Sequence, residues 1–153
     1  MRSSTIEVRE QLMRLKREKL KLEAPTSFSR FLGYSNPKYE LEWFHKLIAD
    51  HCQMLLEGKI KNMMVFMPPQ HGKSEIISRN FPAWALGQNP DLKIVGCSYS
   101  SDLAQQFSRS IQRTIDSKEY QAIFPETYLN GSNIRTDSRG YLRNVDLFEM
   151  VGH

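Results

Sequence analysis

A run of five apolar residues, 63–67, stops abruptly at two prolines, and this boundary constrains the fold more than any other feature. Such a continuous apolar run predicts a short strand that is covered on both faces. Pro68 and Pro69 cannot continue a strand ladder, so they predict a loop, which leads into Gly72-Lys73-Ser74. Residues 74–86 then carry apolar side chains at helical spacing, with a kink or a second helical piece expected at Pro82.

A second unit of the same kind follows. Residues 93–98 predict another short strand, and Ser101 or Asp102 is expected to cap a helix that carries Leu103, Phe107, Ile111 and Ile115 on one face. Strands that alternate with helices over short connections form right-handed βαβ units. The expected fold class is therefore α/β, with a parallel sheet that has helices on both faces.

The remaining segments are less regular. Residues 1–23 predict an amphipathic helix with seven basic and four acidic residues, and 24–36 a connector with at most a short helical turn. A helix is expected from Asn36 as cap and Pro37 as first residue to a stop at Gly58. Turn signals at Asn130-Gly131 and at residues 138–140 suggest a C-terminal hairpin.

Length and composition exclude several classes of protein. A chain of 153 residues with 40% apolar and 25% charged residues is typical of one globular domain. The longest apolar run is far shorter than a membrane span needs, and the N-terminal residues do not form a secretory signal. Two cysteines, Cys52 and Cys97, indicate a reducing compartment, and both are expected to be buried free thiols.

The loop between the first strand and its helix predicts a phosphate site. Gly72, Lys73 and Ser74 match the end of the pattern G-x-x-x-x-G-K-[ST], although Met67 stands in place of the first glycine. Backbone N–H groups at a helix start favour an anion, Lys73 would contact β and γ phosphates, and the Ser74 hydroxyl would ligate Mg²⁺. The alternative is that Lys73 is simply a solvated lysine.

Two other kinds of site are not supported. Residues 96–100 nearly match the G-x-S-x-G nucleophile elbow but lack its last glycine, and His153 is the only histidine that follows Ser98. The four histidines have no metal-ligand spacing with one another or with the cysteines. These are His45, His51, His71 and His153.

Three segments together resemble the ATPase region of the large terminase subunit of tailed bacterial viruses. They are residues 68–75 (PPQHGKSE), 81–87 (FPAWALG) and 98–109 (SYSSDLAQQFSR), and Ile123-Phe124-Pro125 fits the same pattern. The resemblance runs from about Tyr39 to the end of the chain. It implies a RecA-like P-loop ATPase, which would drive packaging of viral DNA into a procapsid and precede a nuclease domain.

The resemblance also assigns roles to residues. ATP would be held by the loop from Met67, with Mg²⁺ on Ser74; Gln70 stands where many relatives have an arginine. Adenine would lie near Tyr39, Trp43 and His45. Arg109 or Arg113 could act between subunits, and the alternative is that both are solvated arginines on their helix. The loop residues are Pro68, Pro69, Gln70, His71, Gly72, Lys73 and Ser74. Residues 1–36 are expected to form a basic arm and connector, and 37–153 the N-terminal part of the ATPase domain.

One part of the family pattern is not found in this sequence. No apolar strand ends in the acidic residues that would hold Mg²⁺ through water and orient the attacking water. We therefore expect an N-terminal piece of a longer protein, with feeble ATP hydrolysis at most. Expected partners are double-stranded viral DNA, the small terminase subunit, the capsid portal and further copies in a ring, with no membrane, in the host cytoplasm.

Two alternatives remain open at this point. The first is a non-catalytic nucleotide-binding or interaction remnant that docks through its basic arm. The second is a P-loop kinase for a small molecule, although the sequence offers no acceptor pocket or base for one.

Overall fold

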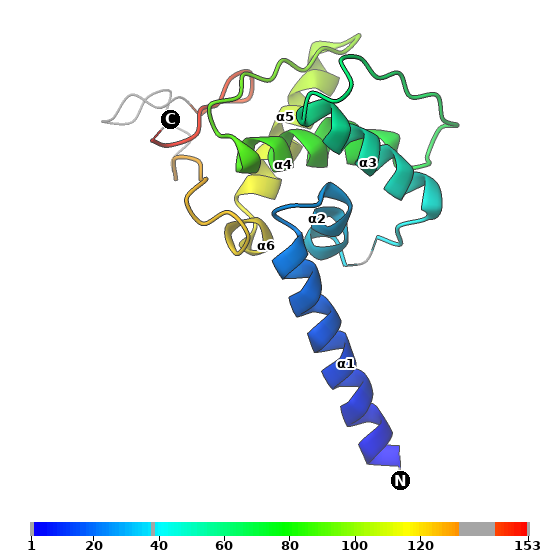
Figure 1. Ribbon diagram of the computed structural model, residues 1–153. Helices are drawn as coiled ribbons and strands as arrows, with labels where there is room; N and C mark the ends of the chain where they lie inside the picture. The colour runs from blue at the N-terminus through cyan, green and yellow to red at the C-terminus, as the bar shows by residue number, and fades with distance from the viewer. Residues whose placement is uncertain (1, 38, 132–142, 153) are drawn as a thin grey trace.

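The computed structural model describes residues 2–37, 39–131 and 143–152, and these are mainly helical. Figure 1 shows a body formed by α2 to α6, from which α1 projects with the N-terminus at its far end. The elements are α1 (Arg2–Glu23), α2 (Phe28–Ser35), α3 (Trp43–Leu56), the π-helix η1 (Glu75–Asn80), α4 (Phe81–Gln88), α5 (Ser101–Ile115) and α6 (Lys118–Gln121).

Helix α2 lies at the centre of the body, in the segment where only a connector was expected. It packs against α1, α3, α4 and α6. Its buried side chains are Phe28, Phe31, Leu32 and Tyr34. Three of these recur at the i, i+3, i+4 spacing of one helix face, which explains why this short segment is helical rather than a loop.

Aromatic side chains from several elements make up much of the core. The rings of Phe28 and Trp84 are 5.2 Å apart, and Trp84 Nε1–H donates to the Ala24 carbonyl at 3.0 Å. The buried Tyr120 hydroxyl donates to the Ala83 carbonyl at 3.1 Å. These two bonds satisfy the polar ends of large buried rings, as packing of Trp and Tyr in a core requires.

Helix α3 begins later than the sequence predicted. Asn36 caps the C-terminus of α2 instead, and Glu42 is the N-cap of α3 in a reciprocal capping box with His45. The predicted stop is confirmed: Gly58 has a φ of 71° and its N–H donates to the Leu55 carbonyl at 3.1 Å. The capping box decides the start because it satisfies backbone N–H groups that Pro37 could not.

The two helices that follow the predicted strands are confirmed. Helix α4 follows η1 directly, and Pro82 lies in its first turn, so a second helical piece begins at the proline as expected. Helix α5 spans the predicted residues, but its cap is Ser100, whose side chain accepts from the Leu103 N–H.

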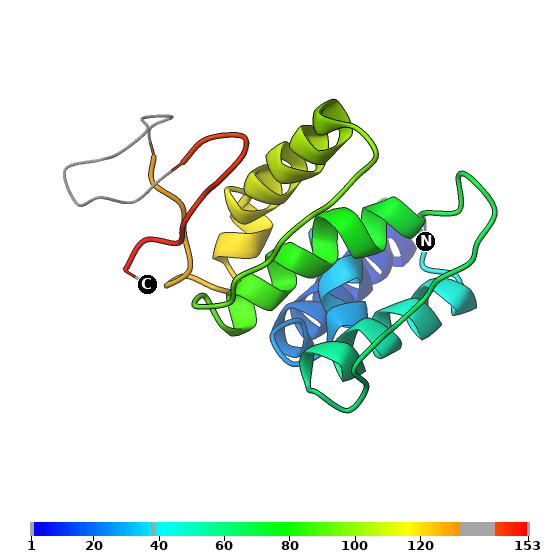
Figure 2. The same ribbon diagram turned by 90° about the horizontal axis from the view of Figure 1, so that it is seen from above.

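The predicted parallel sheet is wrong. Residues 62–68 and 92–98 have no regular secondary structure, and the described residues contain no strand or sheet. Figure 2 shows these two segments as open traces beside the helices. Met63, Val65 and Met67 pack against the core, whereas Met64 and Phe66 are exposed, so the first segment alternates like a strand but pairs with no strand within residues 2–37, 39–131 and 143–152. A strand forms only when a neighbouring backbone supplies its hydrogen bonds, and an apolar run cannot provide those alone.

The described residues of the C-terminal segment, 128–131 and 143–152, pair at two isolated points. Isolated antiparallel bridges join Leu129 to Met150 and Arg143 to Phe148. The predicted turn at 138–140 lies outside the described residues, so the hairpin prediction is only partly tested. Arg143 fastens this segment to α5 through ion pairing with Asp116 and a 3.3 Å hydrogen bond to Gln112. In the part of the chain that is described, the helices are too short or too polar to cross a membrane.

Candidate functional site

The predicted phosphate loop, residues 68–74, leads directly into a helical segment. Gln70 and Gly72 have positive φ angles of 65° and 79°. The Gly72 carbonyl accepts the Ile76 N–H at 3.0 Å, so the helical hydrogen-bond pattern starts inside the loop. Lys73 and Ser74 are both exposed at this point. The loop therefore presents an ammonium and a hydroxyl to solvent at the start of a helix.

Gly72 is required at its position because Tyr39 lies against it. A β-carbon built on Gly72 would lie 1.8 Å from Tyr39 Oη and 3.2 Å from His45 Nε2. No side chain fits there, and the positive φ would also strain any L-residue. The glycine of the motif thus has a structural reason in this chain: the backbone must pass close to two side chains.

His45 connects the start of α3 to the loop. It is 6% exposed. Its Nδ1 accepts the Glu42 backbone N–H at 3.1 Å, and its Nε2 lies 3.1 Å from the His71 carbonyl oxygen and 3.0 Å from Tyr39 Oη. His71 itself is exposed, and its Nδ1 lies 2.8 Å from the Pro69 carbonyl oxygen. Tyr39, His45 and the loop therefore form one hydrogen-bonded group.

Among the described residues, the charges around the loop leave Lys73 without a carboxylate partner. Glu75 follows it, but its carboxylate accepts from Arg79 at 2.8 Å and from Asn80 at 3.1 Å. Across residues 2–37, 39–131 and 143–152, no ion pair involves Lys73. Burial, and then the negative charge of Glu75, raises the pKa of the Tyr39 hydroxyl, so this group stays protonated at neutral pH.

The structure brings together only some of the residues that the sequence singled out. Tyr39 joins the loop, but Trp43 is 73% exposed and its ring contacts Phe44 edge-on at 5.7 Å. Arg109 and Arg113 are exposed on α5, where Arg109 donates to Gln105 of its own helix at 3.4 Å. Nothing in this arrangement assigns those two arginines to the loop.

Sequence reasoning missed the bond from His45 to the loop. The spacing Glu42-x-x-His45 is that of a capping box in which histidine replaces the usual glutamate. That spacing was a readable signal for a helix start, and hence for a fixed imidazole. No local pattern, however, predicts that its other nitrogen reaches residue 71.

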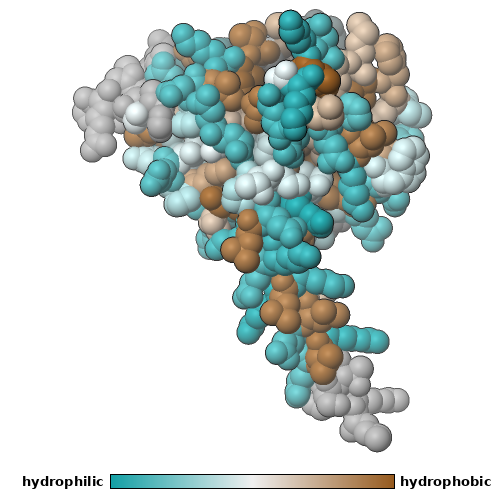
Figure 3. Space-filling view, in the orientation of Figure 1, coloured by the Kyte–Doolittle hydropathy of each residue, from teal (hydrophilic) through white to brown (hydrophobic). Residues whose placement is uncertain are grey.

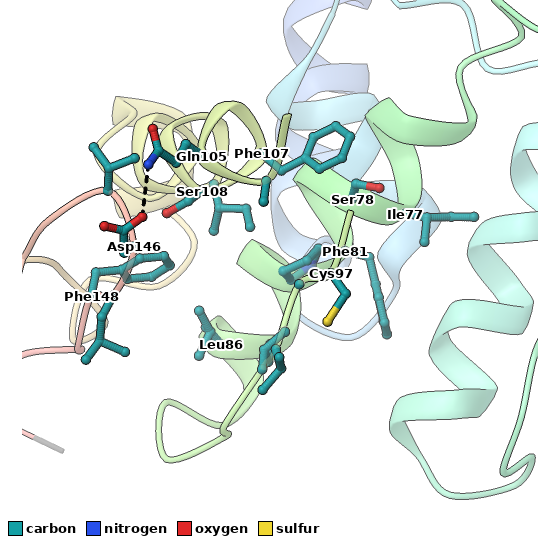
Figure 4. Close-up of a pocket in the computed structure, with 18 of the residues that line it drawn as sticks. Ile77, Ser78, Phe81, Leu86, Cys97, Gln105, Phe107, Ser108, Asp146 and Phe148 are labelled. Atoms are coloured by element: carbon teal, nitrogen blue, oxygen red, sulfur yellow. Dashed lines mark hydrogen bonds between the residues drawn. The ribbon is translucent and has the colours of Figure 1, made fainter. Parts of the chain in front are cut away.

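A separate, mostly apolar cavity of about 490 Å³ lies between η1, α4, the segment 92–97 and α5. Figure 4 shows Phe81, Leu86 and Phe107 around it, with the 3.1 Å bond from Gln105 to Asp146 at one side. None of residues 68–74 lines it. Among the described residues, no cluster of three His, Cys, Asp or Glu side chains could hold a metal ion.

Comparison with family models identifies the chain. Residues 64–144, more than half of the sequence, match the model described as terminase large subunit, T4-like-virus type, N-terminal. The chain belongs to this terminase family. The predicted resemblance is confirmed, and with it a role in DNA packaging by a terminase. The matched region of this terminase begins just before the loop and includes η1, α4 and α5. The curated proteins and the solved structures yielded no match.

Proposed function

We propose that this chain is the nucleotide-binding part of a phage DNA-packaging terminase and that residues 67–74 hold MgATP. The observation that carries the proposal is the Gly72-Lys73-Ser74 sequence on a fixed, solvent-facing loop at a helix start, inside the matched family region. Backbone N–H groups at such a start favour phosphate. The exposed Lys73 ammonium, which forms no ion pair with the residues that the structure describes, suits the β and γ phosphates.

Ser74 is the residue that would hold the magnesium ion. Its side chain is exposed and makes no cap bond to the helix, so the hydroxyl is available as a ligand. Magnesium bound there would neutralise phosphate charge, and the protein would supply one hydroxyl ligand beside phosphate oxygens and water. The same proposal includes ATP hydrolysis by the packaging motor. It also includes the motor's partners, which are double-stranded viral DNA, the small terminase subunit, the portal and further copies of the chain in a ring.

Replacing Lys73 tests nucleotide binding directly. Hydrogen bonds to charged groups contribute about 1.5–3 kcal/mol, so Lys73→Ala should weaken MgATP binding by roughly 10- to 150-fold. Lys61→Ala is the matched control, because Lys61 is also an exposed lysine but lies outside the loop. Titration with a fluorescent ATP analogue measures both. Equal affinities for wild type and Lys73→Ala would rule out this site.

A second candidate function is a DNA-contacting arm that acts without nucleotide turnover. Figure 3 shows α1 standing clear of the body with hydrophilic and hydrophobic residues exposed along it. Arg9, Arg14 and Lys16 are exposed on this helix. If they contact phosphates, changing all three to Gln should lower the salt dependence of duplex DNA binding by up to about three units of the log–log slope. Changing Lys59, Lys61 and Lys93 to Gln is the control, and equal effects of the two triple changes would exclude the arm.

A further inference from the structure

The two ring nitrogens of His45 have different fixed roles. Nδ1 accepts the backbone N–H of Glu42 at 3.1 Å, and a nitrogen that accepts a hydrogen bond carries no proton. A charged imidazole would have protons on both nitrogens, so this bond requires the neutral ring. In the neutral ring the single proton must then lie on Nε2.

The Nε2 proton points at the loop. The His71 carbonyl oxygen lies 3.1 Å from Nε2, and a carbonyl can only accept, so this bond requires the tautomer that the Glu42 N–H selects. The Tyr39 hydroxyl oxygen shares the same proton at 3.0 Å. The cap of α3 thus determines which nitrogen of His45 can donate to the loop.

The bond to the His71 carbonyl also orients the next N–H. A peptide unit is planar and trans, so its C=O and N–H point in opposite directions. Because the His71 carbonyl is directed at His45, the Gly72 N–H is directed away from it. On the other side of His71, Gln70 has a positive φ of 65°, a conformation that a residue other than glycine keeps only when neighbouring groups hold it.

We propose that His45 is a positioning residue for the phosphate loop: its neutral Nε2–H form holds the His71 carbonyl and thereby directs the Gly72 N–H toward a bound anion. The inference rests on the proposed function of the loop for its consequence in binding, but the positioning itself can be observed without nucleotide. It differs from a role near adenine, because the contact is with the loop backbone.

Two substitutions separate the two bonds of His45. An Asn side chain reaches about as far as Nδ1, so His45→Asn keeps an acceptor for the Glu42 N–H and loses the donor to the loop. A Gln side chain reaches about as far as Nε2, so His45→Gln keeps the loop donor and loses the cap acceptor. His51→Asn is the control, since His51 is exposed on the same helix and its Nδ1 lies 2.8 Å from the Leu47 carbonyl oxygen.

The readout without nucleotide is the rate of trypsin cleavage after Lys73, followed by mass spectrometry of the full chain. We expect His45→Asn to be cleaved about fivefold faster than wild type, and His45→Gln and His51→Asn to stay within about twofold. The thermal midpoint should fall at least as far in His45→Gln as in His45→Asn, because the former loses the helix cap. Cleavage rates that simply follow thermal stability would overturn the proposal.

MgATP affinity and the tautomer complete the test. Affinity should fall about fivefold in His45→Asn and remain within about twofold in His45→Gln. If wild type binds no MgATP while the order of cleavage rates holds, the proposed function fails and the positioning role stands. The tautomer is read from ¹⁵N shifts of the His45 ring in the wild-type chain, which needs no variant to fold. A proton found on Nδ1 would refute the positioning role.

Discussion

Replacing Gly72 by alanine should destabilise the protein for two separable reasons. With φ at 79°, an L-residue costs roughly 1–2 kcal/mol in the left-handed region. The new β-carbon would also lie 1.8 Å from Tyr39 Oη, so the Tyr39 ring must leave and its hydrogen bond to His45 is lost, at about 1 kcal/mol. The expected total loss in free energy of unfolding is about 2–3 kcal/mol.

Gly58 provides the matched control. Its φ is 71°, but no atom of the described residues lies within 4 Å of a β-carbon built on it. Gly58→Ala should therefore show the backbone cost alone, about 1–2 kcal/mol. Urea denaturation of both variants, analysed at a common m-value, gives the difference that belongs to Tyr39.

A double-mutant cycle refines this test. Tyr39→Phe removes the oxygen, and the ring carbon Cζ then lies 3.1 Å from the built β-carbon. Gly72→Ala should then cost about 1 kcal/mol less in the Tyr39→Phe variant than in wild type. If Gly72→Ala is no more destabilising than Gly58→Ala, and the cycle shows no coupling, Tyr39 does not pack against the loop as described.

Three further predictions concern the body of the protein. Gly87→Ala should lower the free energy of unfolding by about 1–3 kcal/mol, because its β-carbon would lie 2.5 Å from the Phe124 ring. Gly33→Ala meets only ordinary contacts at 3.6 Å or more and should raise the free energy of unfolding by about 0.5–1 kcal/mol. Urea denaturation measures both, and the reverse order would contradict this packing. Burial raises the pKa of the Cys52 thiol to about 12, so this thiol stays protonated at pH 8. Cys52 should therefore resist a thiol reagent that labels the exposed Cys97. Equal labelling rates of the two cysteines in the folded protein would contradict the burial of Cys52. A chain that begins at Met13 should have a thermal midpoint within about 2 °C of the full chain, because the removed side chains from Ile6 onward are exposed. A larger fall in the midpoint would show that these side chains pack in the folded protein.

The success of sequence reasoning varied with the range of the interactions involved. Helices α1 and α5 and the end of α3 at Gly58 were predicted, because periodicity and a C-terminal glycine act within a few residues. The prediction that Cys97 is buried was wrong, since its apolar neighbours in sequence do not cover it in the fold. Helix α2 was missed although Phe28, Phe31 and Leu32 have helical spacing, because three apolar positions in eight residues form a stable helix only once other helices bury them.

The sequence alone determined the terminase family, the Gly72-Lys73-Ser74 loop and the helix that follows it, because short motifs carry that information directly. It could not determine whether residues 63–67 and 93–98 would pair, since strand pairing depends on backbone groups far away along the chain. Only the tertiary structure decided that these segments pair with no strand in the described part of the chain and that Tyr39 and His45 fasten the loop. Both outcomes depend on distances between residues that are remote in sequence, which only the packed chain defines.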